Sequence, residues 1–286
     1  MAIAGFSQVG VVGAGQMGAG IAQVCASSGL RVTVTDLSSG VLEAASRNIQ
    51  ASAARLCQKG HLTAEQQKLT AEIDYTTDLS RLRDCDLIIE AVIEDEAIKK
   101  DLFVRLDQSV SPETVLATNT SSLPVTRLAS VTNRADRVIG IHFMNPVPLM
   151  RLVEIIPGIA TSPEVQSRAV ELVTALGKEV SLSRDFPGFV VNRILMPMIN
   201  EAFAALMEGV ASAEDIDKGM KLGTNQPMGP LTLADFIGLD TCLAIMEVLH
   251  TGFGDPKYRP CPLLRQYVDA GWLGRKSGRG VYTYNN

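Results

Sequence analysis

The feature that most constrains the fold is a glycine-rich hexapeptide at residues 13–18, with the sequence GAGQMG. It directly follows the apolar run at residues 9–12, which is typical of a buried strand, and it opens a segment with helical spacing of apolar residues. A strand, a glycine turn and a helix in this order predict the start of a βαβ unit. The glycines that such a turn requires are Gly13, Gly15 and Gly18.

Short β-rich runs alternate with longer helical patterns over the first part of the chain, which is typical of a parallel sheet with crossover helices. Strands are predicted at residues 9–12, 32–35, 87–92, 114–118, 138–141, 152–156 and 179–183. Helices are predicted at residues 19–28, 38–59, 63–72 and 98–109. Most strand runs lack polar/apolar alternation, as expected for strands that are buried on both faces.

After residue 185 the pattern changes, and no strand is predicted before the last few residues. Helices are predicted at residues 189–208, 212–221, 231–250 and 263–270. The sequence therefore predicts a Rossmann-type, doubly wound α/β domain with a mostly parallel sheet at residues 1–185, and a smaller all-helical domain at residues 186–286. The length of 286 residues agrees with two domains.

An acidic residue, Asp36, ends the second predicted strand. Together with the strand before the glycines and the helix after them, it distinguishes a dinucleotide-binding site from a chance glycine string. Free N–H groups at the start of the helix, where Gln16 and Met17 lie, can bind a pyrophosphate. The Asp36 carboxylate can accept hydrogen bonds from ribose hydroxyls and would repel a 2′-phosphate, and no arginine follows it at residues 37–39. We therefore predict NAD rather than NADP.

The composition excludes several classes of function. With 26 Lys+Arg against 31 Asp+Glu, the net charge of −5 argues against a general binder of nucleic acid or anionic membranes. Five scattered cysteines without C-x-x-C spacing predict reduced thiols rather than a metal site or a disulfide framework. The N-terminus lacks the layout of a signal peptide, and the apolar stretch at residues 188–206 carries too many polar groups to span lipid. We expect a cytoplasmic protein.

The chain has three histidines, and their positions differ in kind. His61 lies in a polar turn, and His250 ends a predicted helix, where a cation favourably meets the helix dipole. His142 follows the predicted strand at residues 138–141, at the edge where ligands bind in open α/β sheets. The segment 119–122 (NTSS) ends the preceding strand, and Glu154 lies on the following one.

A histidine base, a carboxylate that orients it and a nearby hydroxyl form a coherent set for proton transfer. His142, Glu154 and the serines of residues 119–122 supply these groups. From the residues alone, a structural histidine with satisfied hydrogen bonds is an equal alternative.

Motifs along essentially the whole chain resemble the 3-hydroxyacyl-CoA dehydrogenase family, in its short bacterial form, the 3-hydroxybutyryl-CoA dehydrogenase type. The motifs occur in order at residues 11–18 (VVGAGQMG), 89–91 (IEA), 119–122 (NTSS), 140–148 (GIHFMNPVP), 152–154 (LVE), 187–193 (PGFVVNR), 227–230 (PMGP), 238–240 (GLD) and 274–282 (GRKSGRGVY). The glycine loop alone is a weak signal, whereas this ordered set is specific.

The resemblance implies reversible, NAD-dependent oxidation of a short-chain (S)-3-hydroxyacyl-CoA to the 3-ketoacyl-CoA. It implies that His142 takes the proton from the 3-hydroxyl group and that Glu154 pairs with His142. Ser121 and Asn192 are implied to bind the reacting oxygen or the thioester end of the substrate. Implied cofactor contacts, beyond the glycine loop and Asp36, come from Glu94, Lys99, Asn119, Ser121, His142 and Lys276.

The chain departs from the family pattern at two places. Phe143-Met144 stands where the family has two phenylalanines, and methionine can fill the same apolar space. The segment before residue 61, which carries several lysines toward the CoA phosphates in the family, here holds Arg47, Arg55 and Lys59. We expect Arg55 and Lys59 to bind the acyl-CoA substrate, and a solvated helix face is the alternative.

Two other functions compete with this interpretation. The β-hydroxyacid dehydrogenases also join a Rossmann domain to helices, but they use a lysine on the first long helix of the second domain, and residues 188–201 contain none. A non-catalytic, crystallin-like NAD-binding protein is disfavoured by the joint presence of His142, Glu154, Ser121 and Asn192.

We also expect a homodimer through the helical domain, because its apolar residues exceed what a small domain readily buries. The alternative is that these residues form the core of the domain itself.

Overall fold

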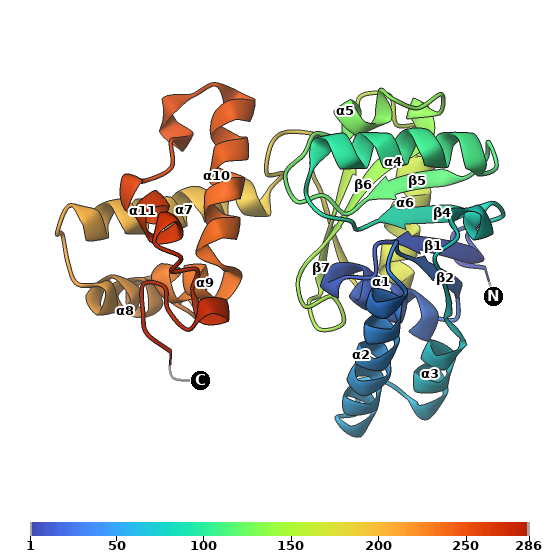
Figure 1. Cartoon of the computed structure of the whole chain (residues 1–286), viewed down its shortest axis with the longest axis horizontal. Helices are drawn as coiled ribbons and strands as arrows, with labels where there is room; N and C mark the ends of the chain where they lie inside the picture. The colour runs from blue at the N-terminus through green and yellow to red at the C-terminus, as the bar shows by residue number, and fades with distance from the viewer. Residues whose placement is uncertain (1, 285–286) are drawn as a thin grey trace. The chain divides into compact units, whose positions relative to one another are not determined.

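The computed structural model describes residues 2–284. The chain forms two compact units, the first ending at Phe186 and the second beginning at Pro187 (Figure 1). Each unit has a buried apolar core of its own. Within the described residues, no helix combines the length and apolar character that crossing a bilayer requires.

The first unit is built on a sheet that has eight strands within the described residues, in the order β3-β2-β1-β4-β5-β6-β7-β8. Neighbouring strands are parallel except β6 and β7, which are antiparallel. The strands are β1 Gln8–Val12, β2 Arg31–Thr35, β3 Asp74–Thr76, β4 Leu87–Glu90, β5 Val115–Thr118, β6 Val138–Phe143, β7 Leu152–Pro157 and β8 Glu179–Leu182. This order of the first six strands is that of a doubly wound sheet, so the predicted Rossmann-type fold is confirmed.

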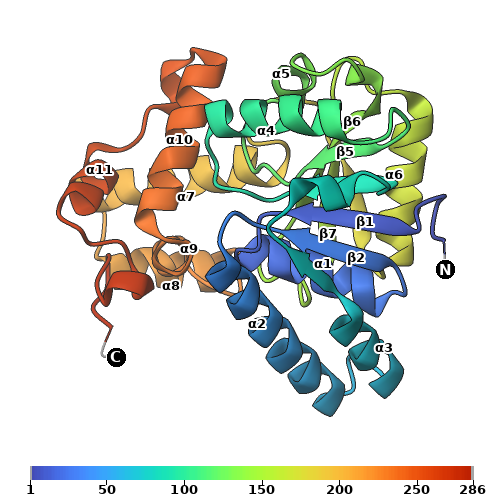
Figure 2. The same cartoon turned by 45° about the vertical axis from the view of Figure 1, so that its right-hand side comes forward.

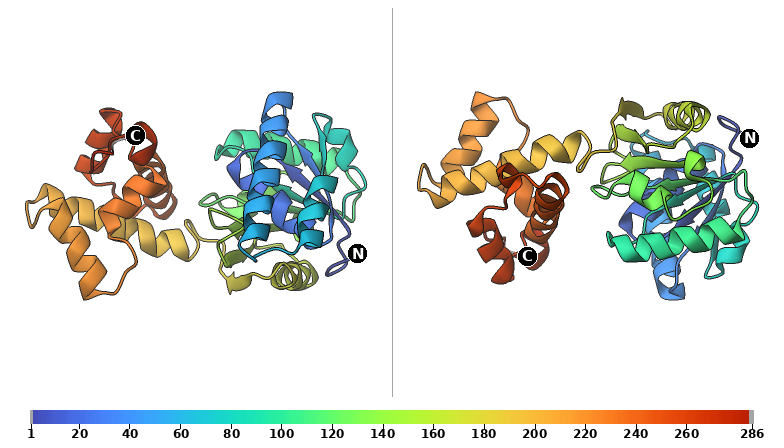
Figure 3. Two further views of the ribbon diagram at one scale, coloured as in Figure 1. Left: turned by 90° about the horizontal axis from the view of Figure 1, so that it is seen from below. Right: turned by 90° about the horizontal axis from the view of Figure 1, so that it is seen from above.

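Helices cover both faces of the sheet. They are α1 Gln16–Ser27, α2 Ser39–Gln58, α3 Ala64–Leu69, α4 Glu96–Ser109, α5 Val125–Ala129 and α6 Pro163–Ala175. Apolar residues of α1, α2 and α6 share one buried cluster with side chains of the central strands. Figure 3 shows α4 and α6 on opposite sides of the sheet. Side-chain caps begin several of these helices, such as Ser38 at α2, Asp95 at α4 and Ser162 at α6.

The central strands are buried on both faces, as their continuous apolar runs predict. Every residue of β4, β5 and β6 is buried. Strand β6 is two residues longer than predicted and includes His142 and Phe143. Strand β3 and helices α5 and α6 lie outside the elements predicted from the sequence. Strand β3 is a three-residue strand at the edge of the sheet, which gives almost no periodicity to detect.

The second unit is helical, and no strand occurs between residues 187 and 284. Its helices are α7 Val191–Met207, α8 Ala213–Gly223, α9 Pro230–Ile237, α10 Leu239–Phe253 and α11 Pro262–Asp269 (Figure 2). Its core contains residues of α7, α9, α10 and α11, including Met196, Phe203, Leu231, Leu249 and Leu264. Part of the apolar surface proposed for a dimer contact is therefore core of this unit.

The single helix predicted at residues 231–250 is wrong. The structure has two helices, α9 and α10, which meet at Gly238. Gly238 has φ 106°, a backbone conformation that other residues rarely adopt, so it ends one helix and begins the next. His250 consequently lies in the last turn of α10 rather than at its end, and Gly254 caps the helix.

Two buried aspartates hold the C-terminal segment on this unit. Asp217 accepts hydrogen bonds from the backbone N–H of Leu231 and from the Tyr282 hydroxyl. Asp235 accepts hydrogen bonds from the N–H groups of Val281 and Tyr282 and from the Tyr284 hydroxyl. These acceptors thereby fix the segment, in addition to the packing of Val281 and Tyr282 against the apolar core of the unit.

Candidate active site and cofactor-binding edge

The glycine loop connects β1 to α1 at the carboxyl edge of the sheet. Gly13 has φ 99°, and a Cβ atom there would lie 2.6 Å from the carbonyl oxygen of Ala91. A Cβ atom on Gly18 would overlap the carbonyl oxygen of Gly13, so this glycine allows the helix to pack on the strand. At Gly15, no atom lies within 4 Å of the Cβ position among the described residues. A ligand can therefore approach the backbone closely at Gly15, as a pyrophosphate requires.

The N-terminus of α1 fits an anionic group. Gly15 is its N-cap residue and offers no side chain to the first N–H groups of the helix. Gln16 and Met17 open the helix, and its first turn contains no acidic residue. Free N–H groups and the partial positive charge of the helix dipole thus remain available to phosphate oxygens.

Asp36 lies just after β2, beside the glycine loop. Its Oδ2 accepts a hydrogen bond from the backbone N–H of Ala14 at 2.8 Å, and its Oδ1 accepts one from the N–H of Ser38 at 3.1 Å. The carboxylate therefore braces the loop and keeps a negative charge where the adenosine ribose of a dinucleotide lies in this fold.

His142, Glu154 and Ser121 meet at the same edge. The antiparallel register of β6 and β7 sets His142 opposite Glu154, and Ser121 lies in the loop after the neighbouring strand β5. The Nδ1 atom of His142 is 2.8 Å from Glu154 Oε2, and its Nε2 is 3.0 Å from Ser121 Oγ. His142 is 5% exposed, and Glu154 is completely buried.

The two partners of the ring suit different roles. An ionised carboxylate only accepts, so with Glu154 ionised Nδ1 is the donor of that pair. In the neutral ring the lone pair then lies on Nε2, where it can accept a hydrogen bond from the Ser121 hydroxyl. The predicted histidine–carboxylate–hydroxyl cluster is thus assembled in the structure, with the basic nitrogen directed toward the hydroxyl.

The loop that carries Ser121 is held by Glu94. One oxygen of Glu94, Oε1, accepts hydrogen bonds from the hydroxyl of Thr120 and from the N–H groups of Ser121 and Ser122. Burial alone would raise the pKa of the Glu94 carboxyl, but the Lys99 ammonium and the hydrogen bonds from Thr120 and Ser121 lower it overall. Glu94 therefore fixes Ser121 relative to His142 as a charged acceptor.

Lys99 contacts Glu94 and is almost completely buried. Its Nζ is 2.6 Å from Glu90 Oε1 and 3.2 Å from Glu94 Oε2. Glu90 is also buried and accepts hydrogen bonds from the N–H of Val92 and the hydroxyl of Thr118. Lys99 thus contacts two carboxylates of the chain itself, and its expected contact with a cofactor stays a prediction.

Two asparagines contribute to this edge. The side chain of Asn119 accepts a hydrogen bond from the N–H of Phe143 at 2.8 Å, which connects the ends of β5 and β6. Asn145 accepts a hydrogen bond from the Gln16 side chain at 3.0 Å, which connects the loop after β6 to the start of α1. Asn145 is not among the site residues predicted from the sequence, although it lies three residues after His142 at the same edge.

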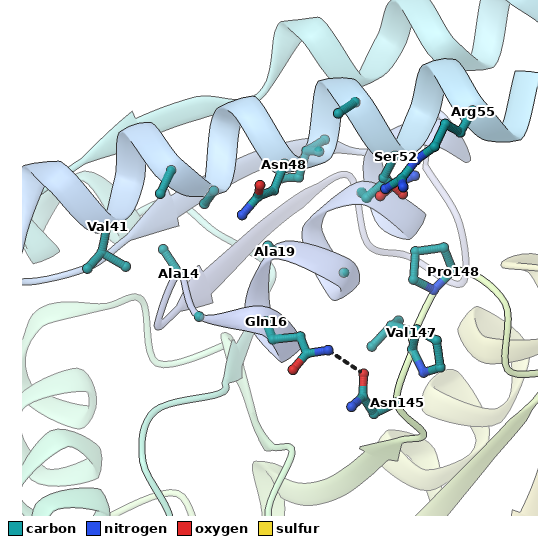
Figure 4. Close-up of a pocket in the computed structure, with 18 of the residues that line it drawn as sticks. Ala14, Gln16, Ala19, Val41, Asn48, Ser52, Arg55, Asn145, Val147 and Pro148 are labelled. Atoms are coloured by element: carbon teal, nitrogen blue, oxygen red, sulfur yellow. Dashed lines mark hydrogen bonds between the residues drawn. The ribbon is translucent and has the colours of Figure 1, made fainter. Parts of the chain in front are cut away.

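A cavity of about 760 Å³ lies between α1, α2 and the loop after β6 (Figure 4). One face of each helix lines it, with Gln16, Ala19, Gly20 and Gln23 on α1 and a stripe of mostly small residues on α2. Arg55 lines its end on α2, as Figure 4 shows. Lys59, at the C-cap of α2, and Arg47, paired with Glu43, do not line it.

The remaining predicted site residues lie in the helical unit. Asn192 is buried in the first turn of α7. Lys276 forms an ion pair with Asp240 at 2.6 Å. Their predicted contacts with substrate and cofactor stay predictions. Within the described part of the chain, no group of three or more His, Cys, Asp or Glu side chains could hold a metal ion.

Comparison with known proteins places two family models along the chain. The model of the 3-hydroxyacyl-CoA dehydrogenase NAD-binding domain matches residues 8–186. The model of the 3-hydroxyacyl-CoA dehydrogenase C-terminal domain matches residues 188–284.

Curated relatives and solved structures agree with these matches. A probable 3-hydroxybutyryl-CoA dehydrogenase of Deinococcus radiodurans is 58% identical and covers 96% of this chain and 99% of its own length. A 3-hydroxybutyryl-CoA dehydrogenase of Bradyrhizobium diazoefficiens is 54% identical, with 97% and 95% covered. The crystal structure of (S)-3-hydroxybutyryl-CoA dehydrogenase from Ralstonia eutropha is similar, with a TM-score of 0.94, 50% identity, and coverage of 98% of this chain and 100% of that one.

Proposed function

This chain belongs to the 3-hydroxyacyl-CoA dehydrogenase family, and we propose that it catalyses the reversible, NAD-dependent oxidation of (S)-3-hydroxybutyryl-CoA to acetoacetyl-CoA. Several relatives that span nearly its whole length carry the name 3-hydroxybutyryl-CoA dehydrogenase. The observation that carries the proposal is the His142 ring, held by Glu154 at Nδ1 and by Ser121 at Nε2. A crystallin-like, non-catalytic protein has no need of this arrangement, which disfavours that alternative.

The His142 ring is the base of the proposed reaction. Its Nε2 takes the proton of the 3-hydroxyl group as the C3–O bond becomes a carbonyl, and the Glu154 carboxylate stabilises the positive charge that forms on the ring. When bound, NAD accepts the hydride that leaves C3. In the reverse direction, the charged ring returns its proton to the carbonyl oxygen of acetoacetyl-CoA.

Ser121 shares its hydroxyl between the base and the substrate in this proposal. Its Oγ lies 3.0 Å from His142 Nε2, where it can donate to the neutral ring, and rotation of the hydroxyl would let it donate to the reacting oxygen instead. Because Glu94 fixes the backbone of Ser121, the serine needs no reorganisation of the loop to do so. Asn192 is proposed as a second donor to the reacting oxygen or the thioester.

The cofactor proposal is supported by the carboxyl edge of β1 and β2. The open approach at Gly15 and the uncapped N-terminus of α1 fit a pyrophosphate. Asp36 would bind the ribose hydroxyls and repel the 2′-phosphate of NADP. Glu94, Lys99, Asn119 and, from the helical unit, Lys276 are proposed as further cofactor contacts.

The helical domain is proposed to bind substrate and to form a homodimer. Exposed apolar side chains support the dimer, namely Ile194, Met207, Val210, Leu222 and Phe236. Sedimentation of a monomer at micromolar concentration would contradict it.

All five cysteines are free thiols, which supports a reducing compartment such as the cytoplasm.

The proposed activity is tested with NADH and acetoacetyl-CoA as substrates. The loss of NADH absorbance measures the rate of the reaction. We expect turnover by the wild-type protein, much slower turnover with NADPH, and a loss of about 10²–10⁴-fold in His142→Gln. The matched control is His250→Gln, which should retain activity because His250 lies in the last turn of α10 within the helical unit. A wild-type protein that leaves NADH unchanged would refute the activity, and equal use of NADPH would refute the role of Asp36.

A further inference from the structure

Gln23 is a buried side chain on the wall of the cavity between α1 and α2. It lies on the same face of α1 as Gln16, Ala19 and Gly20, and only 2% of its surface is exposed. Its Nε2 atom is buried and has no hydrogen-bond partner among residues 2–284. Buried side-chain amides normally have partners, so an unpaired donor beside a cavity points to a group that the cavity receives.

The other polar side chains of the cavity differ from Gln23. Gln16, Asn48 and Asn145 are exposed, so water can satisfy them in the absence of a ligand. Gln23 has no such access, and an unpaired buried donor destabilises the folded protein. A residue that lowers the stability of the folded protein and lies in the wall of a binding cavity is typically a functional residue.

The shape and charge of the cavity restrict the ligand. Its α2 wall runs from Gly40 to Arg55, a length of about 22 Å at the helical rise per residue. Alanine and glycine residues make much of the wall, no carboxylate is among its lining residues, and Arg55 supplies a positive charge. The third wall is the loop after β6, which begins directly after the strand that carries His142.

A long, narrow and mostly uncharged chain fits these restrictions, with a thioester near His142 and phosphate near Arg55. The pantetheine arm of an acyl-CoA has this chemistry, and its hydrogen-bonding groups are two amides and one hydroxyl, of which the amides supply carbonyl acceptors. We propose that, when substrate binds, the Gln23 side chain turns toward the cavity and donates a hydrogen bond from Nε2 to an amide carbonyl of the pantetheine arm, and so selects CoA thioesters over simpler ones. This inference rests on the proposed function.

Three acetoacetyl thioesters separate the contribution of Gln23 from that of the reacting end. They are acetoacetyl-CoA, acetoacetyl-pantetheine, and S-ethyl acetothioacetate, which has the same reacting end but no amide. In Gln23→Leu we expect kcat/KM to fall roughly five- to tenfold for the first two thioesters, through KM. We expect no change in kcat/KM for the S-ethyl ester or in the KM for NADH.

Stability distinguishes binding from a structural role. Leucine removes an unpaired buried donor at nearly constant volume, so the Tm of Gln23→Leu should equal or exceed that of the wild type. Gln23→Met repeats the test with a more flexible side chain. The matched control is Gln50→Leu on α2, because Gln50 donates to the carbonyl of Thr70 and does not line the cavity. It should lose stability and keep its kcat/KM for all three thioesters.

Direct binding gives a second measurement. Titration calorimetry should show CoA binding to Gln23→Leu weakened by the same factor as kcat/KM. An equal loss with all three thioesters, an unchanged kcat/KM for acetoacetyl-pantetheine, or a raised KM for NADH would each overturn the inference. If the wild type turns over none of the thioesters, the proposed function itself is refuted, which is a different result from normal turnover without a Gln23 effect.

Discussion

The ammonium group of Lys99 lies 2.6 Å from a carboxylate oxygen of Glu90, and both side chains are almost completely buried. The same ammonium lies 3.2 Å from Glu94. The other oxygen of Glu94 accepts hydrogen bonds from the loop that carries Ser121. A change at Lys99 therefore reaches the active site through Glu94, without any contact of its own with the reacting atoms.

Lys99→Met should strongly destabilise the first unit. The variant leaves the Glu90 carboxylate buried without a counter-charge, and breaking a buried ion pair typically costs about 3–5 kcal/mol. Urea denaturation measures the change in the free energy of unfolding. The matched control is Lys100→Met, whose partner Glu96 is partly exposed, and it should cost less than about 1 kcal/mol. Equal effects of the two substitutions would show that the buried pair has no special importance.

The fall in the free energy of unfolding at acidic pH should depend on Glu94. Burial alone would raise the pKa of its carboxyl, yet Lys99 and the hydrogen bonds from Thr120 and Ser121 hold it below the ordinary value of 4.5. A depressed carboxyl pKa gives stability that is complete above the ordinary value and is lost as the pH falls through the folded-state value. We expect Glu94→Gln to remove this part of the acid decline. Parallel curves of unfolding free energy against pH for the two proteins would contradict the role of this charge.

The fall in the free energy of unfolding at alkaline pH should depend on Tyr284. Burial and the hydrogen bond to Asp235 raise the pKa of Tyr284 from 10.0 to about 12. A raised pKa favours the protonated form in the folded protein, so its stabilising effect is complete below the ordinary value and is lost as the pH rises toward about 12. Tyr284→Phe should flatten that decline, which thermal unfolding at increasing pH measures. An unchanged slope would show that the hydroxyl is not held by Asp235 in solution.

The sequence was sufficient to predict the elements that local rules determine. The glycine loop at residues 13–18 had a strand before it, a helix after it and an acid beyond, and each is present in the structure. The positions of His142 and Glu154 on consecutive predicted strands made their pairing feasible if those strands are neighbours, and the family resemblance implied it; the register of β6 and β7 confirms it. The glycine loop was found from periodicity and order along the chain, which the sequence displays directly.

Burial of charge could not be predicted in the same way. Lys99, Glu90 and Asp235 resemble surface residues in the sequence, and the structure buries all three. Their partners lie in other elements, so only the tertiary fold shows that the charges are compensated. The break at Gly238 was missed for a related reason, since an isolated glycine within a helical pattern is tolerated in many helices.

The role of Glu154 can be separated from that of a structural hydrogen-bond partner. Glu154→Gln keeps the shape of the side chain and an oxygen that can accept the Nδ1 proton, but it removes the charge that stabilises the protonated ring. We expect kcat for acetoacetyl-CoA reduction to fall by roughly 10²-fold or more, with little change in KM, because the lost interaction strengthens only as the ring charge forms.

Steady-state kinetics on Glu154→Gln and on an exposed control, Glu164→Gln, tests this expectation. The control should match the wild type, since Glu164 lies on the surface of α6 and its ion pair with Arg168 is long, at 4.0 Å. A raised KM with unchanged kcat in Glu154→Gln would mean that the carboxylate only orients the ring for binding. A fall in kcat without a fall in Tm assigns the charge itself to proton transfer, because a structural partner would affect folding before catalysis.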